Sequence, residues 1–418
     1  MSLQVLVLPI SGGYFPKQLG MLLSLLEIGY KPNVSLGNSG GNLVAYLAAL
    51  SDWKPDQTLL TASKLRSDAY IKPWSVVPIA QVLGFFKGAK YNTSTKALDL
   101  FKSLLADRTI TDEIWTLTTN MNCSKPQLYS STTPETSVFG PDIDTKSTGS
   151  LPPIYLNSDT EKLGLVSLAS ASVPTMVPDV KIDGIPYSDG GTSFASPATI
   201  LSDSLRQFTC RASQGNTVGA SGEGLQMTYI SSTNIDQDHC NFNMTPGNTI
   251  TKTRTILSRL IKSLAFLDRK VLIDLIKCCA PDHKTYETEG FVGPDTVAQI
   301  ESLRKNTLTS LVEYYPNFDD PIDYTKFNGD DVLKLALRTQ QDYSYRIWWS
   351  GSADTFSSLH HSRVVHHSQH LEQVRSRTHS VVHHSQHLEL RAIEATIILS
   401  DCFFRKRKTL NVEKVDPW

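Results

Sequence analysis

Two glycine turns decide the fold, and both lie in the stretch LQVLVLPISGGYFPKQLGMLLSLLEIGYKPNVSLGNSGGNLVAYLAAL, residues 3–50. The first apolar run of this stretch ends in Ser11-Gly12-Gly13, and the second ends in Gly37-Asn38-Ser39-Gly40-Gly41. After each turn, apolar residues recur at helical spacing. The order strand, helix, strand, helix predicts a parallel sheet with helices on its faces.

The rest of the chain extends this pattern. Further strands are predicted at 114–119, 127–131 and 226–231, and helices at 162–171 and 249–279. We expect an α/β fold with a mainly parallel central sheet over residues 1–235, and a helical C-terminal extension over 236–350. Because ligand sites in such sheets lie at the carboxyl ends of the strands, the two glycine turns mark the expected site.

The tail, residues 351–418, differs in kind from the rest. Nine of the eleven histidines fall between His360 and His387, and the string VVHHSQHLE at 364–372 recurs at 381–389. Two copies are too few for a solenoid, so we interpret them as a tandem duplication in a disordered tail. Metal binding is the alternative, although no Cys or Asp pattern accompanies the histidines.

Composition excludes several classes of protein. The 40 basic and 41 acidic residues leave a net charge of −1, so no overall field attracts nucleic acid. Six scattered cysteines without a CxxC spacing favour a reducing compartment. The first apolar run lacks the features of a signal peptide, and no apolar stretch approaches the length of a membrane span. These features predict a cytoplasmic protein that contacts membranes at most peripherally.

Ser39 is the candidate nucleophile, because Gly37 to Gly41 satisfies the pattern G-x-S-x-G. This pattern places a serine on a sharp strand-to-helix turn, where small neighbours let the two elements cross. The alternative is a structural glycine turn. A serine hydroxyl also needs a base, and no histidine precedes His239. His239 and His283 are therefore the candidates for a Ser-His-Asp triad.

A carboxylate is the other candidate base. Asp189 lies in IPYSDGG, residues 185–191, where the two glycines allow a close approach to another loop. A buried carboxylate with a raised proton affinity can accept the proton of a nearby serine hydroxyl. Asp189 is thus the candidate base of a Ser-Asp pair.

Together, these motifs resemble the patatin-like phospholipase family. The glycine turn at 11–13, the G-x-S-x-G motif, the small-residue stretch ASASVP at 169–174 and the Asp-Gly-Gly motif occur in the family's order. The resemblance implies a three-layer patatin-like fold and hydrolysis of fatty acyl esters of phospholipids or related lipids, without a metal or organic cofactor.

The resemblance also implies roles for individual residues. Ser39 is the implied nucleophile, which forms an acyl-enzyme, and Asp189 is the implied base. The implied oxyanion donors are the amides of Gly12, Gly13 and Gly40. The remaining motif glycines are Gly37, Gly41, Gly190 and Gly191.

One loop departs from the family pattern, which has three glycines followed by x-[RK]-G. Ser11 stands in place of the first glycine and Pro16 in place of the last, and the loop is about one residue shorter. The resemblance therefore does not carry Lys17 over to the family's basic position. A patatin-like scaffold that binds lipid or protein without turnover is the alternative function.

An apolar segment at 74–86 has two interpretations. It contains Trp74, Phe85 and Phe86 and is flanked by Lys72, Lys87 and Lys90. Such a segment is typical of a lid or membrane-facing surface with basic anchors. Ordinary core packing is the alternative.

Overall fold

The computed structural model describes residues 2–73, 91–93, 99, 103, 110–174, 177–213, 225–235, 249–278, 285–304, 309–323 and 326–350. The apolar segment at 74–86, both histidines His239 and His283, and the repeated tail lie outside these residues. The chain divides into two compact units, Met1–His360 and His361–Trp418, and the description below concerns the first.

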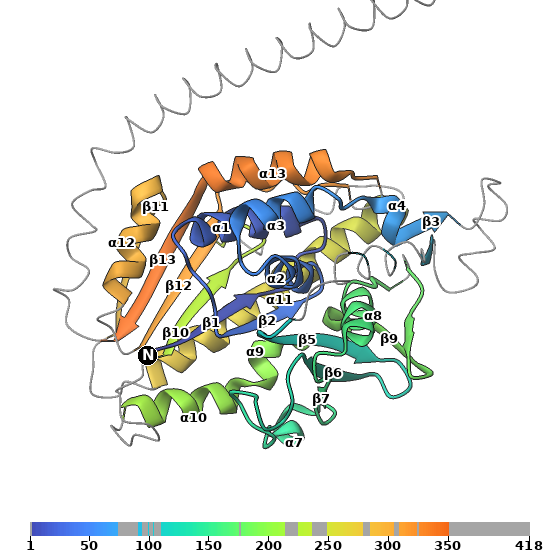
Figure 1. The fold of residues 1–418 in the computed structure, drawn as a ribbon, viewed down its shortest axis with the longest axis horizontal. Helices are drawn as coiled ribbons and strands as arrows, with labels where there is room; N and C mark the ends of the chain where they lie inside the picture. The colour runs from blue at the N-terminus through green and yellow to red at the C-terminus, as the bar shows by residue number, and fades with distance from the viewer. Residues whose placement is uncertain are drawn as a thin grey trace, which may run out of the picture. The chain divides into compact units, whose positions relative to one another are not determined.

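One large sheet forms the centre of this unit (Figure 1). Its strands, in spatial order, are β11 (Thr285–Phe291), β13 (Tyr343–Ser350), β12 (Thr309–Pro316), β10 (Leu225–Ile230), β1 (Leu3–Leu8), β2 (Val34–Asn38), β5 (Glu113–Asn120), β6 (Lys125–Ser130) and β7 (Ile154–Tyr155). Two further strands, β8 (Val180–Ile182) and β9 (Ile185–Asp189), join the sheet because β9 pairs with β5. A separate ribbon is formed by β3 (Ile71–Pro73) and β4 (Tyr91–Thr93).

The middle of the sheet is parallel. The pairs β12–β10, β10–β1, β1–β2 and β2–β5 all run in the same direction. Antiparallel pairing occurs toward the two edges, where β13 joins β12 and β6 joins β5. Strands of the parallel core are buried on both faces, which explains their near-continuous apolar sequences.

Helices cover both faces and make three layers (Figure 1). One core cluster lies under α1 (Phe15–Glu27), α2 (Gly40–Leu50), α8 (Thr160–Ser170) and α13 (Gly329–Gln341). The other lies under α9 (Pro197–Ile200), α10 (Ser202–Ser213) and α11 (Thr249–Cys278). Residues of β1 alternate between the two clusters, with Leu6 and Leu8 in the first and Val5 and Val7 in the second.

The other α-helices among the described residues are α3 (Pro55–Ala62), α4 (Ser67–Tyr70), α7 (Thr145–Thr148) and α12 (Pro294–Arg304). Ala62 of α3 and Ile300 of α12 belong to the first core cluster. Among the described residues, no helix has both the length and the apolar character that a membrane span requires.

The predicted α/β architecture with a mainly parallel sheet is confirmed, but the expected boundary at residue 235 is wrong. The region 236–350 was predicted to be a helical extension, whereas it adds β11, β12 and β13 to the same sheet. In particular, β12 pairs in parallel with β10 along six residues. These strands follow α11 in the chain and contain charged residues such as Glu313 and Arg346, so no apolar run marks them in the sequence.

Candidate active site

Strand β5 brings the predicted nucleophile and base together. Its Leu117 pairs with Asn38 at the end of β2, and the next residue, Thr118, pairs with Asp189 at the end of β9. Strand β2 runs parallel to β5, and β9 runs antiparallel to it. The carboxyl ends of β2 and β9 therefore meet beside Leu117 and Thr118 of β5. Ser39 follows β2 directly, so it lies beside Asp189.

Ser39 occupies a strained turn between β2 and α2. Its backbone has φ 53° and ψ −127°, a region that residues other than glycine rarely adopt. Ser170, at the end of α8, stabilises the turn, because its hydroxyl accepts the Ser39 amide at 3.0 Å. The first amides of α2 follow immediately, so the positive end of this helix adjoins the hydroxyl.

The side chains of the two residues form a hydrogen bond. Oγ of Ser39 donates to Oδ2 of Asp189 at 2.7 Å, and the second carboxylate oxygen accepts the Gly191 amide at 2.8 Å. Ser39 is 2% exposed and Asp189 is 3% exposed. Burial raises the pKa of Asp189 to about 6, and the two hydrogen bonds partly oppose this rise. Asp189 is therefore a stronger base than an ordinary carboxylate, yet is ionised at neutral pH.

The backbone of Asp189 is fixed by one side chain of β5 and by one backbone carbonyl that follows α8. The Thr119 hydroxyl donates to the Asp189 carbonyl at 2.9 Å, and the Asp189 amide donates to the Ser172 carbonyl at 3.0 Å. The sequence prediction missed Thr119, which lies on a strand without a motif. It also missed Ser170 and Ser172 individually, although both lie in the small-residue stretch at 169–174.

The two predicted glycine turns pack against each other. A side chain at Gly40 would meet Oγ of Ser11, and the Gly12 carbonyl oxygen lies 3.1 Å from its Cβ position. Ser11 is fully buried, and its hydroxyl has no hydrogen-bond partner among the described residues. The carbonyl of Gly13 accepts the Ile322 amide at 2.9 Å. The structure thus brings Gly12 to Gly40 and ties Gly13 to the 321–323 segment.

The motif glycines are required by close approach. A Cβ at Gly41 would touch the carbonyl oxygens of Leu8 and Pro9, where α2 crosses the end of β1. A Cβ at Gly190 would lie 2.5 Å from both Oδ1 of Asn38 and the Leu117 carbonyl oxygen. A Cβ at Gly37 would likewise meet Asn42, and a Cβ at Gly191 would meet Ile10. Gly190 therefore lets the loop of Asp189 approach the loop of Ser39, and the other three glycines let their loops pack against neighbouring segments.

Lys17 does not reach this pair. Its Nζ donates to the Phe318 carbonyl at 2.7 Å and lies over the rings of Tyr14 and Phe318. Burial lowers the pKa of Lys17 to about 8, although Asp319 and Asp320 favour the charged form. Lys17 therefore anchors α1 to the segment at 318–320.

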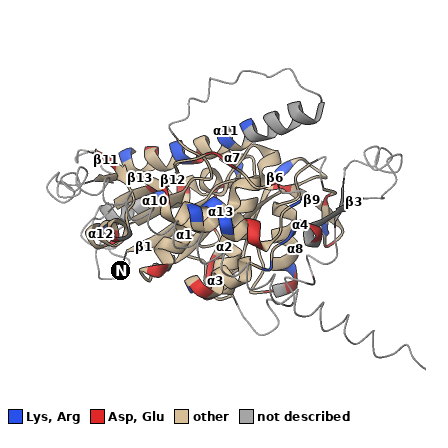
Figure 2. Cartoon of the chain, turned by 90° about the horizontal axis from the view of Figure 1, so that it is seen from above, with Lys and Arg blue, Asp and Glu red and all other residues tan. Residues whose placement is uncertain are grey.

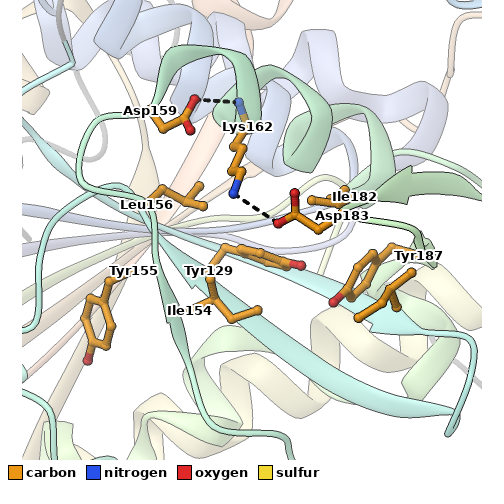
Figure 3. A pocket seen from close by; sticks show the side chains of 10 residues that line it. Tyr129, Ile154, Tyr155, Leu156, Asp159, Lys162, Ile182, Asp183 and Tyr187 are labelled. Carbon is orange, nitrogen blue, oxygen red and sulfur yellow. Dashed lines mark hydrogen bonds and ion pairs between the residues drawn. The ribbon is translucent and has the colours of Figure 1, made fainter.

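A small pocket lies on the same side of the sheet as α8, at the outer end of β9 (Figure 3). Its volume is about 160 Å³, and it is lined by Tyr129, Tyr155, Tyr187 and the ion pair of Lys162 with Asp183. Neither Ser39 nor Asp189 lines it. It is smaller than the clefts of about 300–1,000 Å³ that hold most small-molecule ligands.

Comparisons with known proteins find one family match. No curated protein sequence matches the chain. Among solved structures, VipD from Legionella pneumophila is similar at 12% identity and a TM-score of 0.27, covering 81% of this chain and 67% of VipD. Residues 12–202 match the family model of the patatin-like phospholipases, a range that contains both Ser39 and Asp189. Residues 12–202, somewhat less than half of the chain, are thus similar to the patatin-like phospholipases, a family that generally hydrolyses lipids.

Proposed function

We propose that the protein hydrolyses fatty acyl esters of phospholipids or related lipids through a Ser39–Asp189 dyad. The observation that carries this proposal is the 2.7 Å hydrogen bond from the Ser39 hydroxyl to the Asp189 carboxylate. The family match supports lipid acyl hydrolysis in general, and the dyad extends it to a mechanism.

In the first half of the reaction, Oγ of Ser39 attacks the ester carbonyl carbon and its proton passes to Oδ2 of Asp189. The carbonyl becomes a tetrahedral oxyanion. When it collapses, the bond from carbon to the alcohol oxygen breaks and Asp189 returns the proton to that oxygen. A lysolipid or alcohol leaves, and the fatty acyl group remains as an ester on Ser39.

In the second half, water replaces the alcohol. Asp189 accepts a proton from water as the water oxygen attacks the acyl carbon. Collapse of the second oxyanion breaks the bond to Oγ, which recovers its proton from Asp189. The products are a free fatty acid and the regenerated Ser39 hydroxyl.

Backbone amides stabilise the oxyanion in this proposal. Gly40 follows the nucleophile and starts α2, so its amide adds to the positive end of the helix. Gly12 packs against Gly40 and is the second proposed donor, and Gly13 the third. Loss of one well-placed donor typically reduces turnover about 100- to 1,000-fold. Because amides supply this stabilisation, the reaction requires no calcium.

The test is release of fatty acid from mixed phospholipid vesicles with calcium chelated. Wild type is compared with Ser39→Ala and Asp189→Asn, each checked for folding by thermal unfolding. We expect turnover in wild type and its loss in both variants. Folded wild type that binds vesicles but releases no fatty acid would instead support the scaffold function.

A second pair of variants separates the dyad from a triad. His239→Gln and His283→Gln remove the two histidines that the sequence offers as bases. A dyad enzyme keeps most of its activity in both variants, whereas a triad enzyme loses most turnover in one of them. Activity that survives Asp189→Asn but not one histidine variant would contradict the proposed base.

We also propose a cytoplasmic location with transient contact to membranes. The free Cys123 and Cys278 are exposed, which suits a reducing compartment. Nucleic acid is not a proposed partner, since the net charge is −1.

A further inference from the structure

Helix α11 packs against the turn at Gly12 and against the loop that follows Asp189. Cδ1 of Ile261 lies 2.9 Å from the Cβ position of Gly12, and Cδ1 of Leu264 lies 3.2 Å from that of Gly191. Together with Ile10, these two side chains form a small buried cluster separate from the two main cores. Both contacts adjoin the catalytic pair, because Gly12 packs against Gly40 and the Gly191 amide donates to Asp189.

The inner face of α11 is held by polar contacts and carries one unsatisfied group. Nζ of Lys262 forms an ion pair with Asp319 at 2.8 Å, and Arg269 pairs with Glu313. Asp268 is fully buried and accepts no hydrogen bond of ordinary geometry from a described residue, although the Ser196 hydroxyl lies close enough to lower its pKa. A buried carboxyl that is so poorly satisfied weakens the packing of the helix.

The outer face of the same turns exposes apolar side chains next to lysines. Phe266 and Leu267 are 44% and 45% exposed, and they directly follow the turn that covers the site. Lys270 is exposed one turn further, and Lys277 beyond it, against one exposed acid, Asp274. Figure 2 shows basic residues recurring along α11. Apolar residues beside lysines on one helix face are typical of helices that lie on anionic bilayers.

The loop after Asp189 adds a third apolar group. Phe194 is 71% exposed and has a left-handed backbone, φ 54°, which is unusual for a bulky residue. Leu264 contacts Gly191 near the start of this loop. At the end of the loop, the Ser196 hydroxyl lies close enough to Asp268 to lower the pKa of its carboxyl. The loop that carries Phe194 therefore runs along α11.

We propose that an anionic phospholipid bilayer binds this surface, formed by Phe194, Phe266, Leu267 and Lys270, and that binding displaces α11 from the catalytic pair. The inference rests on the proposed function, since it describes how a lipid substrate reaches Ser39. It assigns bilayer contact to α11 rather than to the apolar segment at 74–86. The apolar side chains enter the bilayer, and Lys270 contacts the anionic headgroups.

Bilayer binding is tested by flotation of the full chain with vesicles of phosphatidylglycerol and with vesicles of phosphatidylcholine. All proteins carry Ser39→Ala, so that binding is measured without turnover. We expect wild-type surface residues to bind the anionic vesicles, and Phe266→Glu with Leu267→Glu to weaken binding about tenfold or more. The matched control is Leu60→Glu, which charges an equally exposed leucine on α3, 54% exposed. Equal binding by the control and the double variant would overturn the proposal, as would equal binding to both vesicle types.

Displacement of α11 is tested with a short soluble ester that needs no bilayer. Ile261→Ala and Leu264→Ala remove side chains that cover the two loops, and we expect turnover to increase several-fold. Leu272→Ala is the control, because it truncates a buried residue of α11 in the main core and leaves the cover in place. No increase in the two folded variants, or the same increase in the control, would overturn the proposal.

The two tests also separate this inference from the proposed function. If wild type hydrolyses neither lipid nor soluble ester, the proposed function fails while flotation still tests the surface. If wild type is active but neither test gives the expected difference, the inference fails by itself. Association of two copies that Phe266→Glu with Leu267→Glu abolishes would identify a dimer surface and overturn the bilayer assignment.

Discussion

Oγ of Ser39 lies 2.7 Å from Oδ2 of Asp189, although 150 positions separate the two residues in the chain. Strand β5 brings the two residues together, because its consecutive residues Leu117 and Thr118 pair with Asn38 and with Asp189. The distance between nucleophile and base is thus set by backbone register in a buried sheet, and the side chains need little adjustment.

The raised pKa of Asp189 predicts the pH dependence of turnover. The carboxyl must be ionised to accept the Ser39 proton, and its pKa is about 6. The value of kcat/KM for a soluble ester should therefore fall as pH decreases through about 6 and be constant above it. An ordinary histidine has a pKa close to this value. The fall of kcat/KM at low pH should therefore be measured again in a variant that combines His239→Gln with His283→Gln. Its disappearance in that variant would contradict an aspartate base.

Ser170 is predicted to hold the strained turn at Ser39. Ser170→Ala removes the acceptor of the buried Ser39 amide, which typically costs about 1–3 kcal/mol of stability. We expect a lower kcat and a lower unfolding temperature. Ser172→Ala is the control, because the Ser172 hydroxyl bonds only locally, to the Leu168 carbonyl at 2.7 Å. Equal effects on kcat in the two variants would argue against a specific role for Ser170.

Gly41 is predicted to tolerate no side chain. Gly41→Ala places a methyl group against the carbonyl oxygens of Leu8 and Pro9, so the free energy of unfolding should fall by about 3 kcal/mol. Gly293→Ala is a fair comparison, since the nearest atom, Oγ1 of Thr296, would lie 3.6 Å away. Urea denaturation measures both variants. Similar stability in the two would show that α2 and β1 can separate at little cost.

Asp268 is predicted to reduce stability at neutral pH. Burial raises its pKa from 3.8 to about 7, so between these values the unfolded chain ionises while the folded group keeps its proton. Stability therefore falls as pH rises through this window, and the penalty is constant above about 7. Asp268→Asn should raise the unfolding temperature by a few degrees at about pH 8 and change it little at about pH 4. The opposite order would indicate that Asp268 has a charged partner.

The sequence motifs predicted a larger share of the candidate site than the apolar periodicity predicted of the fold. Ser39 and Asp189 were identified because glycine neighbours mark turns that must approach closely, and this signal is local. The strands β11, β12 and β13 were missed, because polar and charged residues interrupt their apolar residues and no motif marks them. Glu313 and Arg346, for example, lie in these strands and are satisfied by partners that are distant in sequence.

The sequence by itself determined the local conformations: a strand that ends in a serine turn, a glycine turn directly after Asp189, and the helices whose apolar spacing repeats every three or four residues. These depend on steric and packing preferences of neighbouring residues, so they can be predicted along the chain. Only the tertiary structure decided that β5 aligns Asn38 with Asp189, that Ser170 accepts the Ser39 amide, and that Ile261 and Leu264 of α11 lie over the glycine loops. Those contacts join segments far apart in the chain, and they form only when the sheet fixes its strand order and register.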